Sequence, residues 1–154
     1  MTKLKKGDVA PNFELQDQEG NTVALSGFRG KKLLLYFYPK ADTPGCTKQA
    51  CSIRDAKADL SSTGLASLGV SPDDPNKQKK FDEKYNLGFP LLSDPDHKIA
   101  VAYGAWGEKS MYGKKYEGII RSSFLIDEER KIVEAWYNIK PLDTVPKALE
   151  TLNT

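Results

Sequence analysis

The sequence predicts an α/β sandwich in which helices flank a central, mixed β-sheet. One observation is a continuous apolar run, Lys31–Tyr38, whose lack of polar alternation is typical of a strand covered on both faces. A second is the segment order strand–helix–strand–helix, which is typical of α/β proteins. A third is a late pair of strand-like segments followed by a helix, which makes the expected sheet a mixed one.

The chain opens with a loop and a short β-hairpin. Residues 13–15 and 22–25 flank Glu19-Gly20-Asn21, a turn signal between two short apolar segments. The apolar run follows and ends at Pro39, which cannot donate a ladder hydrogen bond. We therefore expect an N-terminal β-hairpin extension and then the central strand.

A long helix is expected after the central strand, over residues 43–60. Thr43 is a good N-cap, and Pro44 suits the first helical position, where its missing N–H costs nothing. Positions on one face then recur at helical spacing, at Ala50, Ile53, Lys57 and Leu60. This helix would begin beyond the carboxyl end of the central strand, where α/β proteins bind ligands.

The remaining segments complete the alternation. They are a strand over residues 65–70, a helix over 73–85, a helix opened by Ser93 and ending near residue 103, a Gly-rich loop around Trp106, strands over 122–126 and 132–137, and a helix over 142–152. No internal repeat or linker divides the chain, so we expect one domain spanning residues 1–154.

Composition narrows the function classes. The 154 residues are 39% hydrophobic and 29% charged, with 23 basic against 21 acidic residues and a net charge of only +2. This balance gives no basic footprint for nucleic acid, and no run approaches the roughly 18 apolar residues of a membrane span. No apolar segment follows the N-terminal lysines, so we expect no signal peptide and a reducing, cytoplasmic compartment.

Cys46 carries the strongest chemical signal. With Thr43 as N-cap, Cys46 is the third helical residue, inside the first turn. The unpaired backbone N–H groups and the positive end of the helix dipole favour an anion there, and a thiolate is such an anion. Gly45 leaves the backbone beside the sulfur uncovered, as a small substrate requires. The alternative is that this cysteine is a small buried hydrophobic residue.

Cys51 lies five residues further along the same predicted helix. Five helical residues place the two Cα atoms roughly 8.6 Å apart, whereas a disulfide needs Cα atoms within about 7 Å. Two interpretations remain open. Either the cysteines never meet, or the first turns of the helix unwind when a disulfide forms, which would trap an oxidised Cys46 before further oxidation.

The residues around Cys46 resemble a known family, the peroxiredoxins. The family pattern P-x-x-x-T-x-x-C is present as Pro39, Thr43 and Cys46. Cys51 stands where the bacterioferritin comigratory protein or peroxiredoxin Q subgroup has its resolving cysteine. Further segments that resemble this subgroup extend almost from end to end, at residues 36–40, 69–73, 89–94 and 120–126.

The resemblance implies a thioredoxin-like fold and a thiol-dependent peroxidase that needs no metal or cofactor. It implies that the Cys46 thiolate attacks hydrogen peroxide or an organic hydroperoxide, while Arg121 stabilises the moving charge and Thr43 hydrogen bonds to sulfur or peroxide. Pro39 would shield the site from bulk water. Cys51 would then form an intramolecular disulfide with Cys46, which thioredoxin or a similar dithiol reduces. A monomer is implied, since the resolving cysteine belongs to the same chain.

Two positions depart from the usual subgroup pattern. Gln49 stands where a Glu is common, and Ser123 where a Thr is common. Gln49 keeps its hydrogen-bonding ability but lacks the negative charge, so we expect altered polar contacts around the active-site helix and retained chemistry. His97, the only histidine, is expected at the surface, because no second His or Cys lies at metal-ligand spacing.

Two other functions compete with a peroxidase. A thiol–disulfide oxidoreductase would also use two cysteines, but such proteins rely on C-x-x-C, and four residues separate Cys46 from Cys51. The other alternative is a binding or holdase module with inert cysteines. Fast reaction of the thiols with peroxide distinguishes the peroxidase from this module, because inert buried cysteines react slowly.

Overall fold

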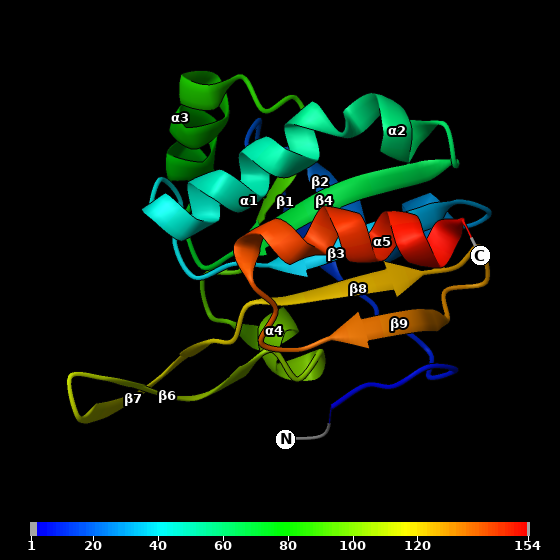
Figure 1. The fold of residues 1–154 in the computed structure, drawn as a ribbon. Coiled ribbons are helices and arrows are strands. Elements are labelled where there is room, and N and C mark those ends of the chain that lie inside the picture. Colours follow the sequence, from blue (N-terminus) through cyan, green and yellow to red (C-terminus); the bar gives the residue numbers. More distant parts are fainter. Residues whose placement is uncertain (1–2, 154) are drawn as a thin grey trace.

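A seven-stranded mixed sheet with strand order β2-β1-β5-β4-β3-β8-β9 runs through the molecule (Figure 1). The computed structural model describes residues 3–153. The one-domain prediction covers residues 1–154, and three of these residues lie outside the described part. The strands are β1 (Glu14–Gln16), β2 (Thr22–Ala24), β3 (Lys32–Phe37), β4 (Leu65–Ser71), β5 (Leu91–Ser93), β6 (Trp106–Met111), β7 (Lys114–Ile119), β8 (Ser122–Ile126) and β9 (Ile132–Trp136). The helices are α1 (Pro44–Asp55), α2 (Lys57–Ser61), α3 (Pro75–Tyr85), α4 (Lys98–Ala102) and α5 (Thr144–Leu152), with 3₁₀ turns η1 (Leu25–Phe28) and η2 (Pro141–Asp143).

Strand β3 is the centre of the fold. It pairs in parallel with β4 and antiparallel with β8, and its side chains are buried from Leu33 onward. Leu33, Leu35 and Phe37 belong to one hydrophobic core, whereas Leu34 and Tyr36 belong to another. The strand is therefore covered on both faces, as its unbroken apolar sequence predicts.

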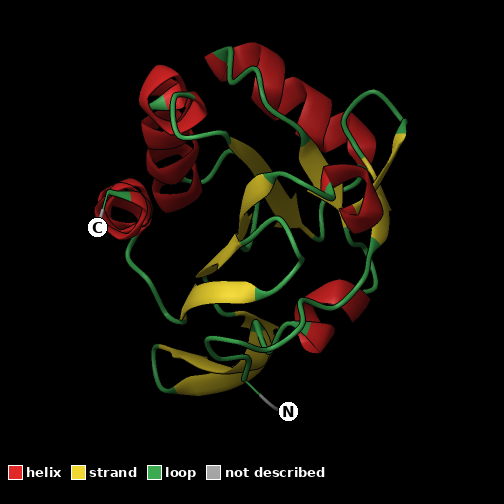
Figure 2. Ribbon diagram, turned by 90° about the vertical axis from the view of Figure 1, so that its right-hand side faces the viewer, coloured by secondary structure: helices red, strands yellow, loops and turns green. Residues whose placement is uncertain are grey.

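Different helices close the two cores. The core that contains Tyr36 also contains Ile53 of α1, Leu60 of α2, Phe81 of α3 and Ala148 of α5. The opposite core is closed by α4 together with the N-terminal segment. Figure 2 shows the strands, in yellow, between helices on the two sides. The predicted α/β sandwich with a mixed, helix-flanked sheet is confirmed.

The prediction of one helix over residues 43–60 is wrong in one respect. The segment forms two helices, α1 and α2, which are separated at Ala56. Ala56 has φ −92° and ψ 6°, and α2 begins at the next residue. Lys57, which the helical pattern placed on the apolar face, is exposed and donates a hydrogen bond to the Gly88 carbonyl at 3.1 Å. The break turns this charged side chain outward while Leu60 stays buried.

The helix expected to open at Ser93 is also wrong at its start. Ser93 ends β5, which pairs in parallel with β4 and antiparallel with β1, so the N-terminal hairpin joins the main sheet. The carboxylate of Asp94 accepts hydrogen bonds from the backbone N–H groups of Ile99 and Ala100, at 3.2 and 3.0 Å. The Asp94 side chain thus pairs two backbone N–H groups in the first turn of α4, and the helix begins at Lys98 rather than at Ser93. The sequence marks β5 only by two buried leucines, too short a run to identify a strand.

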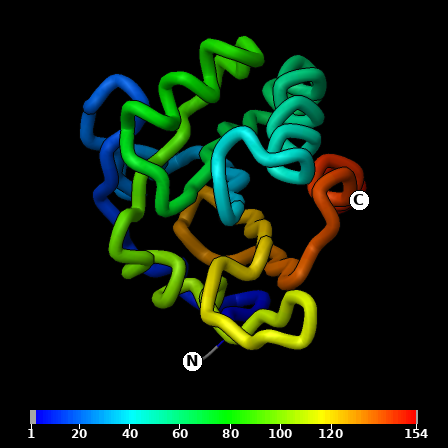
Figure 3. The backbone as a smooth tube through the Cα atoms, turned by 90° about the vertical axis from the view of Figure 1, so that its left-hand side faces the viewer, coloured from blue at the N-terminus to red at the C-terminus, as the bar shows by residue number. Residues whose placement is uncertain are grey.

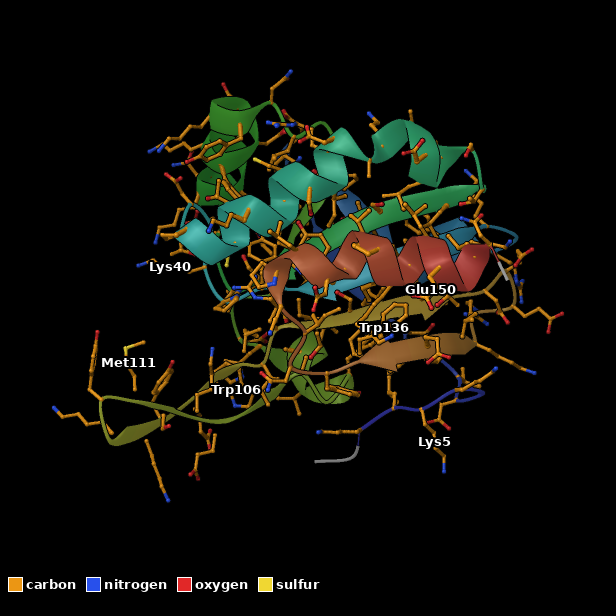
Figure 4. All side chains as sticks on the ribbon, in the orientation of Figure 1. Lys5, Lys40, Trp106, Met111, Trp136 and Glu150 are labelled. Atoms are coloured by element: carbon orange, nitrogen blue, oxygen red, sulfur yellow. The ribbon has the colours of Figure 1, made fainter. Side chains whose placement is uncertain are left out.

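The Gly-rich loop expected around Trp106 is instead a β-hairpin formed by β6 and β7. Trp106 pairs with Ile119 at one end, and Tyr112 and Gly113 form the turn with φ values of 52° and 78°. Two positive φ values are what a tight two-residue hairpin turn requires. The hairpin extends away from the sheet, and Met111 lies near its tip (Figure 4). Most of its residues are exposed, so no alternation of buried and exposed positions reveals it in the sequence.

The C-terminal elements follow the prediction. Strands β8 and β9 pair antiparallel, and the 3₁₀ turn η2 leads into α5. Trp136 of β9 lies under α5 (Figure 4) and packs in the same core as the helix. Within residues 3–153, no helix is both long and apolar enough to cross a membrane.

Gly69 of β4 packs directly against Tyr36, which gives a test of this core. A Cβ at Gly69 would lie 2.9 Å from the Tyr36 ring and hydroxyl, and that ring is fully buried. We expect Gly69→Ala to lower the free energy of unfolding by about 1–3 kcal/mol in urea denaturation, because a close-packed core has no room for the displaced ring. Gly27→Ala, where a Cβ meets nothing within 4 Å, is the control. Equal stability of the Gly69 variant and the wild type would contradict this packing.

Candidate active site

The end of β3 and the starts of α1, β8 and α5 meet at one end of the sheet. Figure 3 shows this end, with the start of α1 in cyan, the β6–β7 hairpin in yellow and the segment entering α5 in orange. Thr43 is the N-cap of α1, with φ −98° and ψ 158°, and Pro44 is its first residue, as predicted. Cys46 therefore lies in the first turn, where it is only 2% exposed.

Arg121 contacts the sulfur of Cys46. Its Nη2 atom donates to Cys46 Sγ at 3.4 Å. Arg121 directly precedes β8, whose first residue, Ser122, pairs with Phe37 at the end of β3. The backbone carbonyl of Arg121 also accepts a hydrogen bond from Ile139 N–H at 2.9 Å. A permanent cation is thus held against the thiol.

Gln49 orients the other side of the same guanidinium. Arg121 Nη1 donates to Gln49 Oε1 at 2.7 Å, and Gln49 is fully buried. None of the ion pairs found among residues 3–153 includes Arg121. Since the amide of Gln49 is neutral, it fixes the guanidinium without cancelling its charge.

Pro39 lines a pocket beside Arg121, and Thr43 is the N-cap of α1. Pro39 and Arg121 line one pocket of about 650 Å³. The Thr43 hydroxyl donates to the Lys40 carbonyl at 2.8 Å, so its proton is already engaged. The structure therefore joins Arg121 to Cys46 by contact and to Pro39 through a shared pocket, while Thr43 stands at the start of the helix.

The two cysteines remain apart and are both free thiols. Helix α1 is continuous through Cys46 and Cys51, and Cys51 is partly buried. An intact helix keeps their Cα atoms roughly 8.6 Å apart, beyond disulfide range. The described conformation thus has two free thiols on an intact α1.

Lys109 is a pocket residue that the sequence analysis missed. It lines the same pocket as Pro39 and Arg121, and its Nζ donates to the Ile119 carbonyl at 2.8 Å. Burial lowers the pKa of Lys109, and the charge of Arg121 lowers it further. Lys109 reaches the pocket because β6 and β7 pair, and the largely exposed sequence of this hairpin carries no signal of that pairing.

Tyr36 of β3 and Tyr38, one residue beyond the strand, lie in the same core as Cys46. Burial raises the pKa of Tyr36, and the neighbouring Tyr38 and Cys46 raise it further. Burial also raises the pKa of Tyr38, whose hydroxyl donates to the buried Gln78 amide oxygen. Both phenols are therefore uncharged at neutral pH.

The sequence predicts His97 at the surface, but in the structure this side chain is half-buried and stacked on Trp106. The two ring centroids are 3.8 Å apart. In the part of the chain that the structure describes, no group of three or more His, Cys, Asp or Glu side chains is arranged to hold a metal ion.

Comparison with known proteins gives the family. A family model described as AhpC/TSA family matches residues 6–135. The chain belongs to this family. It is 51% identical to peroxiredoxin Bcp of Escherichia coli over 140 residues, covering 91% of this chain and 90% of the relative. It is 47% identical to peroxiredoxin Bcp of Bacillus subtilis over 149 residues, covering 97% and 95% of the two chains.

Solved structures of the same group share the fold. Peroxidoxin BcpB of Mycobacterium tuberculosis matches with a TM-score of 0.87 at 36% identity, covering 97% of each chain. A mutant of PrxQ from Xylella fastidiosa matches with a TM-score of 0.92 at 31% identity, covering 99% of this chain and 98% of that one. The resemblance to the Bcp and PrxQ peroxiredoxins and the thioredoxin-like fold are thereby confirmed, and the family supports a thiol-dependent peroxidase activity.

Gly45 provides a test of the Arg121 contact. A Cβ at this position would lie 3.2 Å from Arg121 Nη2 and 3.5 Å from Pro141 Cγ. We expect Gly45→Ala to push the guanidinium away and to slow alkylation of Cys46 by iodoacetamide up to about tenfold.

The measurement uses a Cys51→Ser background, so that Cys46 is the thiol that iodoacetamide alkylates. Gly27→Ala, remote from the site, serves as control and should leave the alkylation rate unchanged. Alkylation at the unaltered rate in Gly45→Ala would show that this contact does not control the reactivity of Cys46.

Proposed function

We propose that this protein is a hydroperoxide reductase in which Cys46 is the attacking thiol and Cys51 the resolving thiol. The observation that carries the proposal is the 3.4 Å contact between Arg121 Nη2 and Cys46 Sγ in the first turn of α1. The helix N-terminus and the guanidinium both favour a thiolate, and the thiolate is the nucleophilic form of cysteine.

In the first step the Cys46 thiolate attacks the terminal oxygen of the peroxide. A sulfur–oxygen bond forms while the oxygen–oxygen bond breaks, and the departing hydroxide or alkoxide takes up a proton to leave as water or alcohol. Arg121 stabilises the negative charge as it moves to the leaving oxygen. The Thr43 hydroxyl, whose proton is already donated to Lys40, offers its oxygen to the O–H of the incoming hydroperoxide. Pro39 covers the site against bulk water.

The proposed substrates are organic hydroperoxides as well as hydrogen peroxide. A pocket of about 650 Å³, lined by Pro39 and Arg121, lies beside the guanidinium that contacts Cys46 and offers room for an organic group. A Xanthomonas campestris bacterioferritin comigratory protein that is 34% identical to this chain, with a TM-score of 0.86, is described as having alkyl peroxide reduction activity. Alkyl hydroperoxides are therefore included in the proposed substrate class.

The second step closes a disulfide within the chain. The first turns of α1 unwind, and the Cys51 thiolate attacks the sulfenic sulfur of Cys46. A sulfur–sulfur bond forms, the sulfur–oxygen bond breaks, and the oxygen leaves as water. Thioredoxin or a similar dithiol then returns two electrons and restores both thiols.

The proposed setting is a monomer in the reducing cytoplasm. Both redox cysteines belong to one chain and are free thiols, so the cycle needs no second copy. The dithiol reductant supplies the only electrons that the cycle consumes, and no metal or cofactor takes part.

Single cysteine substitutions test the assignment of the two thiols. We expect Cys46→Ser to abolish peroxide consumption and Cys51→Ser to consume one equivalent and then stall, because no resolving thiol remains. Stopped-flow peroxide consumption, coupled to thioredoxin, its reductase and NADPH, measures turnover, and intact mass identifies the sulfenic acid or disulfide. Wild-type peroxidase activity in Cys46→Ser would refute the proposal.

Removal of the charge at Arg121 tests the electrostatic role. Arg121→Gln keeps a hydrogen-bonding side chain without the cation, and we expect oxidation of Cys46 by hydrogen peroxide to slow about 10²–10³-fold. Arg29→Gln, an exposed arginine in η1's C-cap position, is the matched control and should react like the wild type. Equal rates for the two variants would remove Arg121 from the proposed mechanism.

A further inference from the structure

Three buried polar side chains from different elements meet behind Arg121. They are Gln49 of α1, Ser123 of β8 and Thr144 at the start of α5, and each is fully buried. The amide nitrogen of Gln49 donates to Thr144 Oγ1 at 3.0 Å, and the hydroxyls of Thr144 and Ser123 share a hydrogen bond of 3.0 Å. With the Arg121 contact at 2.7 Å, this forms a chain of hydrogen bonds that runs from the active-site cation to α5.

Gln49 lies between the two cysteines in the sequence, in the segment that has to unwind. In the folded helix its amide has a partner on each side, Arg121 for the oxygen and Thr144 for the nitrogen. Unwinding between Cys46 and Cys51 withdraws the amide from both partners. A buried polar group that loses its partners costs free energy, so the two contacts oppose unwinding.

We propose that Thr144 is a positioning residue that holds Gln49 in the folded active-site helix and thereby sets how readily Cys51 reaches Cys46. The proposal rests on the proposed function, in which a disulfide closes between these cysteines. Thr144 touches neither thiol and acts only through Gln49. Because α5 packs against the sheet in the same core as α1, it provides a fixed anchor for this contact.

The equilibrium between the folded and the unwound helix determines whether the sulfenic acid forms a disulfide or is oxidised further. The helix must open before the Cys51 thiolate can form the sulfur–sulfur bond and release water, so a tighter hold on Gln49 slows resolution. A slower resolution leaves the Cys46 sulfenic acid exposed for longer to a second peroxide, which oxidises it to a sulfinic acid and releases water or alcohol. Thr144 therefore controls the partition between disulfide and overoxidation.

The test measures the dithiol–disulfide equilibrium of Cys46 and Cys51 in glutathione buffers, where oxidised glutathione takes two electrons and two protons and becomes two molecules of reduced glutathione. Intact mass gives the disulfide fraction. Thr144→Val removes the hydroxyl at constant shape, and Thr144→Ser retains it. We expect Thr144→Val to shift the equilibrium about fivefold toward the disulfide, as for the loss of a hydrogen bond worth about 1 kcal/mol, and Thr144→Ser to remain at the wild-type value.

Two controls separate this role from general destabilisation. Thr63→Val removes another side-chain hydrogen bond, to the Leu60 carbonyl at the end of α2, and should leave the equilibrium unchanged. In a Gln49→Met background, Thr144→Val should have no further effect, because the contact is already absent. Hydrogen exchange in the reduced protein should be about fivefold faster in Thr144→Val for the amides from Cys46 to Cys51, by the same factor.

An equal shift in Thr63→Val, or an undiminished effect of Thr144→Val in the Gln49→Met background, would overturn the proposal. If Thr144→Val does not fold, Gln49→Met alone must shift the equilibrium toward the disulfide by at least the same factor, and an unshifted equilibrium overturns the proposal. A wild-type protein that forms no Cys46–Cys51 disulfide in these buffers overturns it too. Because no peroxide is present, these results stay readable even if the peroxidase assay fails.

Discussion

The antiparallel pairing of β3 with β8 is the constraint on which the active site depends. Phe37, the last residue of β3, lies opposite Ser122, the first residue of β8, so the end of one strand meets the start of the other. The chain leaves β3 toward the helix that carries Cys46, and it enters β8 directly after Arg121. The 3.4 Å contact between cation and thiol thus follows from the register of two strands in the most buried part of the molecule.

Arg121 lies on a fixed part of the structure, whereas the helix that carries both cysteines is the part proposed to unwind. Arg121 is fixed by the sheet and by the backbone hydrogen bond from Ile139. Both cysteines lie on α1, which is separated from α2 by the break at Ala56. Since elements that move in function come from the less stable part of a fold, a short helix bounded by a break suits the proposed unwinding better than one continuous helix would. The buried Leu60 anchors α2 in the core that also contains Ile53 of α1.

The sequence predicts those features that depend on neighbouring residues. The apolar run Lys31–Tyr38 predicts the central strand, and the Thr43–Pro44 start places Cys46 in the first helical turn. Arg121 could be identified only by resemblance, because nothing in its local sequence distinguishes it from an arginine that faces solvent. Lys109 and Thr144 escaped prediction, since each reaches the site through pairing or packing between segments distant in the chain.

Two of the three corrected element assignments, those of β5 and of the β6–β7 hairpin, have the same physical origin. Strand β5 is three residues long and becomes a strand only because β4 and β1 offer hydrogen-bonding partners on either side. The β6–β7 hairpin buries little surface, so its sequence carries no period that reports a strand. Propensity alone does not decide such segments, and tertiary partners do.

Tyr36 and Tyr38, near the end of β3, add no charge to the core around Cys46. Burial raises the pKa of both side chains, so neither phenol ionises near neutral pH. Arg121 stands in contact with the sulfur as a permanent cation. The basic side chains near the sulfur are Arg121, in contact with it, and Lys109, which lines the same pocket as Arg121. In the proposed reaction, electron density that moves from sulfur to oxygen is stabilised on this basic side, which sets the direction in which the leaving oxygen departs.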